Sequence, residues 1–114
     1  MRMLRLTVVV GVLAAALTGC AVRVVTDPAT ESLAPGEILV CRATDPAWTP
    51  LFLAAAGLVT EVGGMMTHGS VVAREYGIPA VVGVHDATGR LTTGQYVRLD
   101  GTSGTIEIID DPEF

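Results

Sequence analysis

The order of apolar and polar residues divides the chain into several short strands and two short helices. Continuous apolar runs bounded by turn residues predict buried strands. Four short segments that are mostly apolar lie at residues 21–25, 37–41, 58–60 and 80–84 and are expected to be strands. Further along, apolar and polar residues alternate over 95–100 and 105–109. This alternation predicts a hairpin that closes through residues 101–104 and buries one face.

Two segments have helical spacing and helical ends. The first is expected to begin with Asp45 as N-cap and Pro46 at the first helical position, and to end at Gly57. The second is expected over His68–Tyr76, with Thr67 as its N-cap. Strands and helices alternate in the middle of the chain, and β-pairs lie at both ends. This order predicts a three-layer or sandwich-like α/β domain with mixed strand pairing.

Size and charge limit what the chain does. Its 114 residues suffice for one small domain, and a hydrophobic fraction of 50% excludes a disordered chain. Seven Lys and Arg residues against twelve Asp and Glu residues give a formal net charge of −5, which excludes nucleic acid as an expected partner. A domain of this size cannot contain a nucleotide-binding domain, an acceptor pocket and a moving element together. Chemistry in several steps would therefore need other domains.

The first twenty residues have two interpretations. A short basic start, an apolar run at 6–17 and the sequence Leu-Thr-Gly-Cys resemble a bacterial lipoprotein signal, in which Cys20 would be lipidated. The apolar run is too short to span a bilayer. In the other interpretation, residues 7–12 form a buried strand. Residues 1–19 are thus a signal-like apolar segment or the first strand of the fold.

The cysteines and histidines do not predict a metal site. Cys20 and Cys41 lack Cys-x-x-Cys spacing, and His68 and His85 lack the spacing of a zinc ligand pair. Free thiols at half-buried apolar positions would explain both cysteines, so the sequence does not require a disulfide between them. His85 is a candidate for a second functional histidine, although a surface turn explains it as well.

The residues with the clearest chemistry surround His68. Thr67 and Ser70 are expected to satisfy the first free N–H groups of the second helix, which leaves His68 in its first turn. The positive end of the helix dipole favours a neutral imidazole, and so keeps a ring nitrogen available as a nucleophile. A phosphoryl group on that nitrogen would lie beside amides that favour anions. The alternative is a helix cap or a surface residue, because no carboxylate lies near His68 in sequence.

Small residues on both sides of this histidine favour the functional interpretation. Gly63 and Gly64 allow the chain to leave the preceding strand sharply, and Gly69 leaves room for a partner to approach the ring. Arg74 either contacts a phosphoryl group or pairs with an acidic residue such as Glu75.

The run GGMMTHGSVVAREYGIPAVVG, residues 63–83, closely resembles the phosphohistidine motif in the mobile domain of the phosphoenolpyruvate-utilising enzymes. These include phosphoenolpyruvate synthase, pyruvate phosphate dikinase and rifampicin phosphotransferase. The resemblance extends upstream through PGEILVCRATDPAWTPLF and downstream through GQYVRLDGTSGTIEI, and covers about residues 21–109. Met66 stands where the motif often has a threonine. The sequence Met-Thr-His-Gly resembles the rifampicin phosphotransferase type more than the synthase type.

This resemblance implies a swivelling β/β/α phosphohistidine domain over residues 20–110, followed by a tail at 111–114. In the family, the histidine takes a phosphoryl group from ATP or phosphoenolpyruvate in one domain and rotates to deliver it in another. The resemblance assigns the nucleophile to His68. The implied phosphoryl-contacting residues are Gly63, Gly64, Thr67, Gly69, Ser70 and Arg74.

The same resemblance implies partners. The sequence has no glycine-rich phosphate loop and no cluster of metal-binding carboxylates. The chain is therefore expected to bind no cofactor itself and to act as a partial phosphotransferase. Mg²⁺ and ATP or phosphoenolpyruvate are expected on an ATP-grasp or phosphoenolpyruvate-binding partner. The expected location is the cytoplasm, with a membrane anchor only if Cys20 is lipidated; the alternative function is a non-catalytic remnant or an exported lipoprotein.

Overall fold

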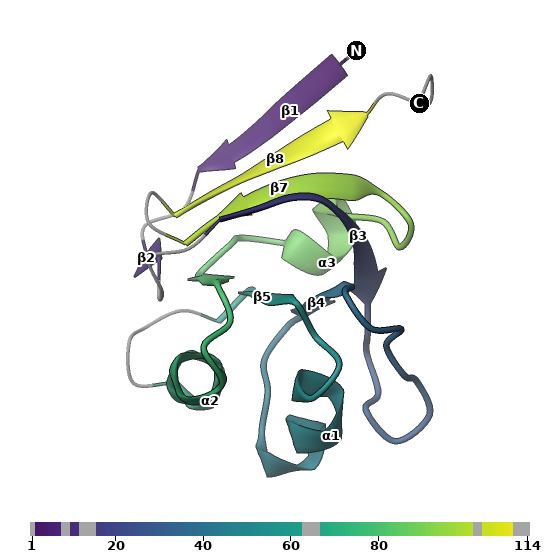
Figure 1. Ribbon diagram of the computed structural model, residues 1–114, viewed down its shortest axis with the longest axis vertical. Helices are drawn as coiled ribbons and strands as arrows, with labels where there is room; N and C mark the ends of the chain where they lie inside the picture. Colours follow the sequence, from purple (N-terminus) through teal and green to yellow (C-terminus); the bar gives the residue numbers. More distant parts are fainter. Residues whose placement is uncertain (1, 8–9, 12–15, 63–66, 102–103, 111–114) are drawn as a thin grey trace.

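One mixed sheet organises the chain in the computed structural model, which describes residues 2–7, 10–11, 16–62, 67–101 and 104–110. Within these residues eight strands follow the order β1-β8-β7-β3-β4-β5-β6-β2 (Figure 1). The strands are β1 (Arg2–Thr7), β2 (Val10–Gly11), β3 (Ala16–Val24), β4 (Ile38–Cys41), β5 (Gly57–Thr60), β6 (Ala80–Val82), β7 (Tyr96–Asp100) and β8 (Thr105–Asp110). The helices are the 3₁₀ turn η1 (Pro46–Trp48), α1 (Thr49–Phe52), α2 (His68–Tyr76) and α3 (Ala87–Arg90).

Strand β3 joins an antiparallel half of the sheet to a parallel half. Its first part pairs antiparallel with β7, and its second part pairs parallel with β4. The register of the β3–β7 pair shifts between Thr18 and Cys20, where Gly19 has a φ of 72°. Glycine adopts this positive φ without steric cost, and such a bulge bends a strand. β3 can therefore turn from one layer into the next.

Alternate side chains of the parallel strands enter two different cores. The first core lies between the parallel strands, the antiparallel strands and α3, and contains Val22, Ile38, Val40, Val59, Val81, Val84, Ala87, Leu91, Val97, Leu99, Ile106 and Ile108. The second lies between the parallel strands and the helices α1 and α2, and contains Val25, Leu33, Leu39, Cys41, Trp48, Leu51, Phe52, Ala55, Leu58, Ala73 and Ala80. The layers are therefore β, β and α (Figure 1), and the predicted α/β swivelling-domain fold is confirmed.

The first predicted helix is shorter than the sequence indicated. Asp45 caps it as expected, because its Oδ1 accepts a hydrogen bond of 2.9 Å from the backbone N–H of Ala47. The turn is 3₁₀ over Pro46–Trp48, and the α-helical part covers only Thr49–Phe52. Pro50 has no N–H to donate and so interrupts the hydrogen-bond ladder.

No element was predicted for the residues that form helix α3. This helix is a single turn whose N-cap, Asp86, is in the left-handed region (φ 55°) and makes no side-chain cap bond. The cap comes from elsewhere in the chain: the carboxylate of Glu61 accepts hydrogen bonds from the backbone N–H of Thr88 at 2.9 Å and from its hydroxyl at 2.5 Å. Local sequence carries no signal for a cap supplied by a residue 27 positions away.

The predicted C-terminal hairpin is present, and the N-terminal segment is paired into the sheet. β7 and β8 are antiparallel, although residues 102–103 of the turn lie outside the described part. β1 pairs with β8 and β2 with β6, while β3 starts at Ala16 rather than at the expected residue 21. Residues 8–9 and 12 of the alternative N-terminal strand also lie outside the described part, as does the tail at 111–114. None of the helices within the described residues has the length and apolar character needed to cross a membrane.

Both cysteines are free thiols. Cys20 is half-buried in β3, whereas Cys41 is buried at the end of β4. Burial raises the pKa of the Cys41 thiol to about 12, so this thiol is neutral at pH 7.

Candidate functional site

His68 begins helix α2, as the sequence predicted. Thr67 is the N-cap, and its hydroxyl accepts a hydrogen bond of 3.4 Å from the backbone N–H of Ser70. The hydroxyls of Thr67 and Ser70 are 2.8 Å apart and form a second hydrogen bond. The helix ends where Gly77 adopts a left-handed φ of 70° and its N–H bonds back to the last turn. His68 therefore lies at the end of the helix that favours negative charge.

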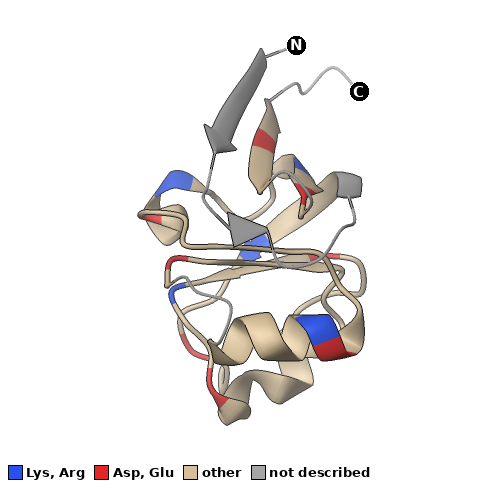
Figure 2. Cartoon of the chain, turned by 90° about the vertical axis from the view of Figure 1, so that its left-hand side faces the viewer, with Lys and Arg blue, Asp and Glu red and all other residues tan. Residues whose placement is uncertain are grey.

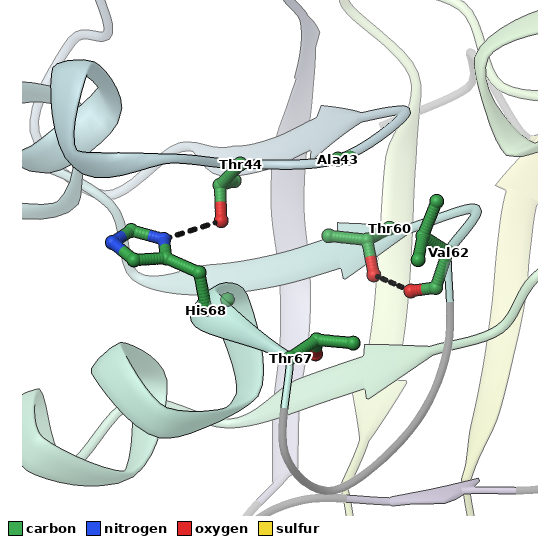
Figure 3. A pocket seen from close by; sticks show the side chains of 7 residues that line it. Ala43, Thr44, Thr60, Val62, Thr67 and His68 are labelled. Atoms are coloured by element: carbon green, nitrogen blue, oxygen red, sulfur yellow. Dashed lines mark hydrogen bonds between the residues drawn. The ribbon is translucent and has the colours of Figure 1, made fainter.

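A hydrogen bond and a ring contact hold the imidazole of His68. The hydroxyl oxygen of Thr44 lies 2.9 Å from Nδ1. The ring of Phe52 meets the imidazole edge to face, with centroids 6.3 Å apart and planes at 70°. Figure 3 shows the other ring nitrogen, Nε2, pointing away from Thr44 and from the other labelled side chains. When Nδ1 carries the proton and donates it to Thr44, Nε2 holds the nucleophilic lone pair.

The half-buried ring borders a pocket of about 230 Å³ (Figure 3). The pocket opens at the carboxyl ends of β4 and β5, where ligands commonly bind to parallel sheets. Its lining residues are Ala43, Thr44, Thr60, Val62, Thr67, His68 and Gly69. Among the described residues, this lining contributes hydroxyls and small side chains and contains no Asp, Glu, Lys or Arg.

The structure brings part of the predicted site together. Thr67, His68 and Gly69 line the pocket, and Ser70 is buried behind the cap. Arg74 lies in the last turn of α2, about 9 Å along the helix axis from His68, and does not line the pocket. Gly63 and Gly64 lie outside the described residues. His85 is exposed next to α3 and is not part of this pocket.

Sequence reasoning missed Thr44 and Phe52 as site residues. Thr44 directly precedes the expected N-cap Asp45, and Phe52 lies within the first expected helix, but neither was predicted to contact His68. Both come from the segment after β4, 24 and 16 positions before His68. Only the parallel pairing of β4 with β5 brings these positions to the same edge.

We expect Thr44→Val to slow phosphorylation of His68 about tenfold, because loss of one hydrogen bond costs about 1 to 1.5 kcal/mol. The valine keeps the shape of the side chain and removes the hydroxyl that holds Nδ1. The measurement is the initial rate of phosphohistidine formation with phosphoramidate, a small chemical donor. Thr92→Val, an exposed change on the loop after α3, is the matched control. An unchanged rate would show that Thr44 does not orient the ring.

Gly69 is packed too closely for a side chain. A Cβ at this position would lie 3.1 Å from Oγ1 of Thr44 and 3.2 Å from Cδ2 of Leu58. Gly69→Ala is expected to change the free energy of unfolding by less than about 1 kcal/mol, because the helix propensity of alanine offsets the crowding. The displaced hydroxyl of Thr44 should nevertheless lower the phosphorylation rate about fivefold. If Gly69→Ala and the native protein have the same phosphorylation rate and the same urea unfolding, the added methyl group does not disturb His68.

Glu61 connects the site to α3. Its backbone N–H and that of Val62 donate to the carbonyl of Arg42, at 3.1 and 3.0 Å, so the two walls of the pocket are bonded together. Hydrogen bonds from the side chain and backbone of Thr88 lower the pKa of the Glu61 carboxyl. Its stabilising effect is therefore complete above the ordinary carboxyl pKa of about 4.3 and is lost as pH falls through the lowered value.

Glu61→Gln should lower the free energy of unfolding by about 1 to 2 kcal/mol at pH 7. The difference from the native protein should shrink below about pH 4, where the native carboxyl becomes protonated. Urea unfolding at the two pH values measures both effects. Glu75→Gln, an exposed change on α2, should alter neither. If the difference in unfolding free energy between Glu61→Gln and the native protein does not change with pH, the negative charge of Glu61 does not stabilise the fold.

Comparison with known proteins identifies the family. Residues 33–104 match the family described as PEP-utilising enzyme, mobile domain. The chain is 62% identical over 87 residues to a protein of Streptomyces sviceus named rifampicin phosphotransferase, and the match covers 76% of this chain and 10% of that protein. The chain thus spans about a tenth of the length of this relative.

Two solved structures resemble the fold. A solution structure of Enzyme I has a TM-score of 0.60 at 30% identity, covering 71% of this chain and 34% of that chain. Aconitase X of Thermococcus kodakaraensis has a TM-score of 0.69 at 22% identity, covering 93% and 98%, which is a likeness of fold alone. By its sequence match over most of its length, the chain belongs to the PEP-utilising enzyme mobile-domain family.

Proposed function

We propose that this chain is a phosphohistidine carrier, in which Nε2 of His68 accepts a phosphoryl group from a donor and passes it to an acceptor. The observation that carries the proposal is the held imidazole: Nδ1 is bonded to Thr44, and Nε2 points away from the labelled residues. In the first step the lone pair of Nε2 attacks the phosphorus of the donor. The new P–N bond forms as the bond from phosphorus to the leaving oxygen breaks, and the proton stays on Nδ1. In the second step the acceptor oxygen attacks phosphorus and the pair in the P–N bond returns to Nε2.

The surroundings of the ring support this chemistry. The nine-residue helix α2 directs its first N–H groups toward the region around His68, where the phosphoryl oxygens would lie. The hydroxyl of Thr44 in the pocket holds Nδ1, whereas Nε2 points away from the labelled pocket residues (Figure 3), so a phosphoryl group on Nε2 would lie outside this pocket.

The donor and acceptor sites are proposed to lie on other polypeptide segments. The match spans only a tenth of the Streptomyces relative, so that protein contains much additional chain. We assign ATP or phosphoenolpyruvate, together with Mg²⁺, to an ATP-grasp or phosphoenolpyruvate-binding partner. Among the described residues, no group of three His, Cys, Asp or Glu side chains is placed to hold a metal ion.

The proposed location is the cytoplasm, where these donors occur. Cys20 lies within β3, paired with Val97. Cleavage before Cys20 would separate it from residues 16–19 of the same strand, including the Gly19 bulge. Intact-mass analysis of the protein from its native host tests this proposal, since a lipid-modified terminus at Cys20 would contradict it.

Chemical phosphorylation tests the central claim. The purified protein is incubated with phosphoramidate, and separately with ATP or phosphoenolpyruvate and a donor protein. We expect an adduct that is labile in acid and stable in base, and peptide mapping should place it on His68. An adduct on His85 alone, or no adduct with any donor, would overturn the proposal.

A further inference from the structure

A second pocket lies at the carboxyl ends of β3 and β4. It has a volume of about 320 Å³, and its lining residues are Val25, Thr26, Arg42, Ala43, Trp48 and Thr88. The first two follow β3 and the next two follow β4, and these strands are parallel. Thr88 belongs to α3 and Trp48 to η1, directly before α1, and these helices pack on opposite faces of the parallel strands (Figure 1). Ligands of α/β sheets commonly bind in such a crevice.

We call this cavity the Arg42 pocket. Within the described part of the chain, Ala43 is the one residue that it shares with the pocket beside His68. His68 and Thr44 do not line it. The proposed phosphoryl transfer at Nε2 therefore makes no use of the Arg42 pocket, although its volume falls within the range of small-molecule sites.

Arg42 gives this pocket a single positive charge. The residue is exposed, and its guanidinium forms no salt bridge or hydrogen bond with any other described side chain. Figure 2 shows the arginines of the described residues as separate blue segments, and Arg42 is the one cation in the lining. A guanidinium offers two parallel N–H groups that match the two oxygens of a carboxylate. The pocket is therefore suited to a ligand with one anionic group.

Two glutamates behind the pocket wall determine how its hydroxyls can bind. The hydroxyl of Thr26 donates to the carboxylate of Glu31 at 3.2 Å, and that of Thr88 donates to the carboxylate of Glu61 at 2.5 Å. Each hydroxyl has thus used its proton, and its oxygen can only accept a hydrogen bond from a ligand. The two carboxylates also repel negative charge, so the surroundings favour a monoanion over a doubly charged phosphate.

We propose that the Arg42 pocket binds a small monocarboxylate that carries an apolar ring and a hydroxyl group. The carboxylate pairs with the guanidinium of Arg42. The ring packs against the buried lining residues Val25 and Trp48, and the ligand hydroxyl donates to the oxygen of Thr26 or Thr88. The inference goes beyond the proposed function and does not depend on it, because none of these contacts involves His68.

An NMR titration of the full chain with 4-hydroxybenzoate tests the site. Trp48 is the single tryptophan of the chain, so the one indole N–H signal reports on this pocket. We expect a saturable shift of that signal with a dissociation constant of about 1 mM or tighter. Methyl 4-hydroxybenzoate, which has no charge, should bind at least about tenfold more weakly. Phenyl phosphate, a dianion at pH 7, should bind about threefold more weakly or worse.

Arg42→Gln should weaken binding of 4-hydroxybenzoate at least about tenfold and leave binding of the methyl ester unchanged, because only the carboxylate needs the guanidinium. Arg98→Gln is the matched control. It removes the same charge from an exposed position on β7 that does not line the pocket, and should leave both affinities unchanged. The signal dispersion of each variant confirms that it is folded.

Loss of carboxylate binding in Arg42→Gln alone supports the proposal. An indole signal that does not move with 4-hydroxybenzoate overturns it, and so does an equal loss in both arginine variants, which would indicate a general effect of charge. Tighter binding of phenyl phosphate overturns the assignment to a carboxylate. His68→Gln should bind 4-hydroxybenzoate as the native protein does, so the carrier function and the Arg42 pocket can fail independently of each other.

Discussion

His68→Gln should abolish the acid-labile phosphoryl adduct with every donor. Glutamine keeps a hydrogen-bonding group near Thr44 but has no nucleophilic ring nitrogen, so no P–N bond can form. We expect less than about 0.1% of the native labelling rate, since loss of a nucleophile typically costs several powers of ten. Intact-mass spectrometry before and after acid treatment measures the adduct directly.

His85→Gln is the matched control for this experiment. His85 is exposed and does not line the pocket. Its replacement should leave labelling at the native rate, and urea unfolding of both variants should resemble that of the native protein. Residual acid-labile label in the His68 variant that disappears in the double variant would identify His85 as a second acceptor, contrary to our expectation.

Local sequence predicted those elements whose ends are determined locally. Thr67 and Gly77 cap α2 with their own hydroxyl and backbone, and the helix begins and ends there as expected. Asp45 caps η1 for the same reason. Helix α3 was missed because its cap is the carboxylate of Glu61. The start of β3 was misplaced because its first residues are held by pairing with β7, which lies far away in sequence.

The same distinction applies to the site. The histidine and its helix were predictable, because the Thr67 cap and the flanking small residues are neighbours in sequence. The hydroxyl that holds Nδ1 was not, because Thr44 follows one parallel strand and His68 follows the next. Arg74, by contrast, is close in sequence, yet helix geometry places it at the far end of α2. The predicted phosphoryl-contacting set thus contained the residues near His68 in sequence and lacked those brought there by strand pairing.

Phe52→Ala should have the largest effect on stability, because this side chain joins the helical core to the site. Phe52 is 2% exposed and contacts the rings of His68 and Tyr76. Truncating a buried phenylalanine costs about 3 to 5 kcal/mol, a large part of the roughly 5 to 15 kcal/mol that stabilises a domain. Urea unfolding measures the loss, and Leu53→Ala, at the neighbouring 77% exposed position, should change stability by less than about 0.5 kcal/mol.

Phe52→Leu separates packing from the ring contact. Leucine refills most of the cavity and should cost less than about 1.5 kcal/mol, so the variant stays folded. It removes the aromatic edge beside the imidazole, an interaction of about 0.5 to 1.5 kcal/mol, and should therefore slow labelling of His68 by phosphoramidate severalfold. Native labelling in this variant would show that Phe52 supports the fold alone. A loss of unfolding free energy below about 1 kcal/mol in Phe52→Ala would contradict the expected contribution of this side chain to stability.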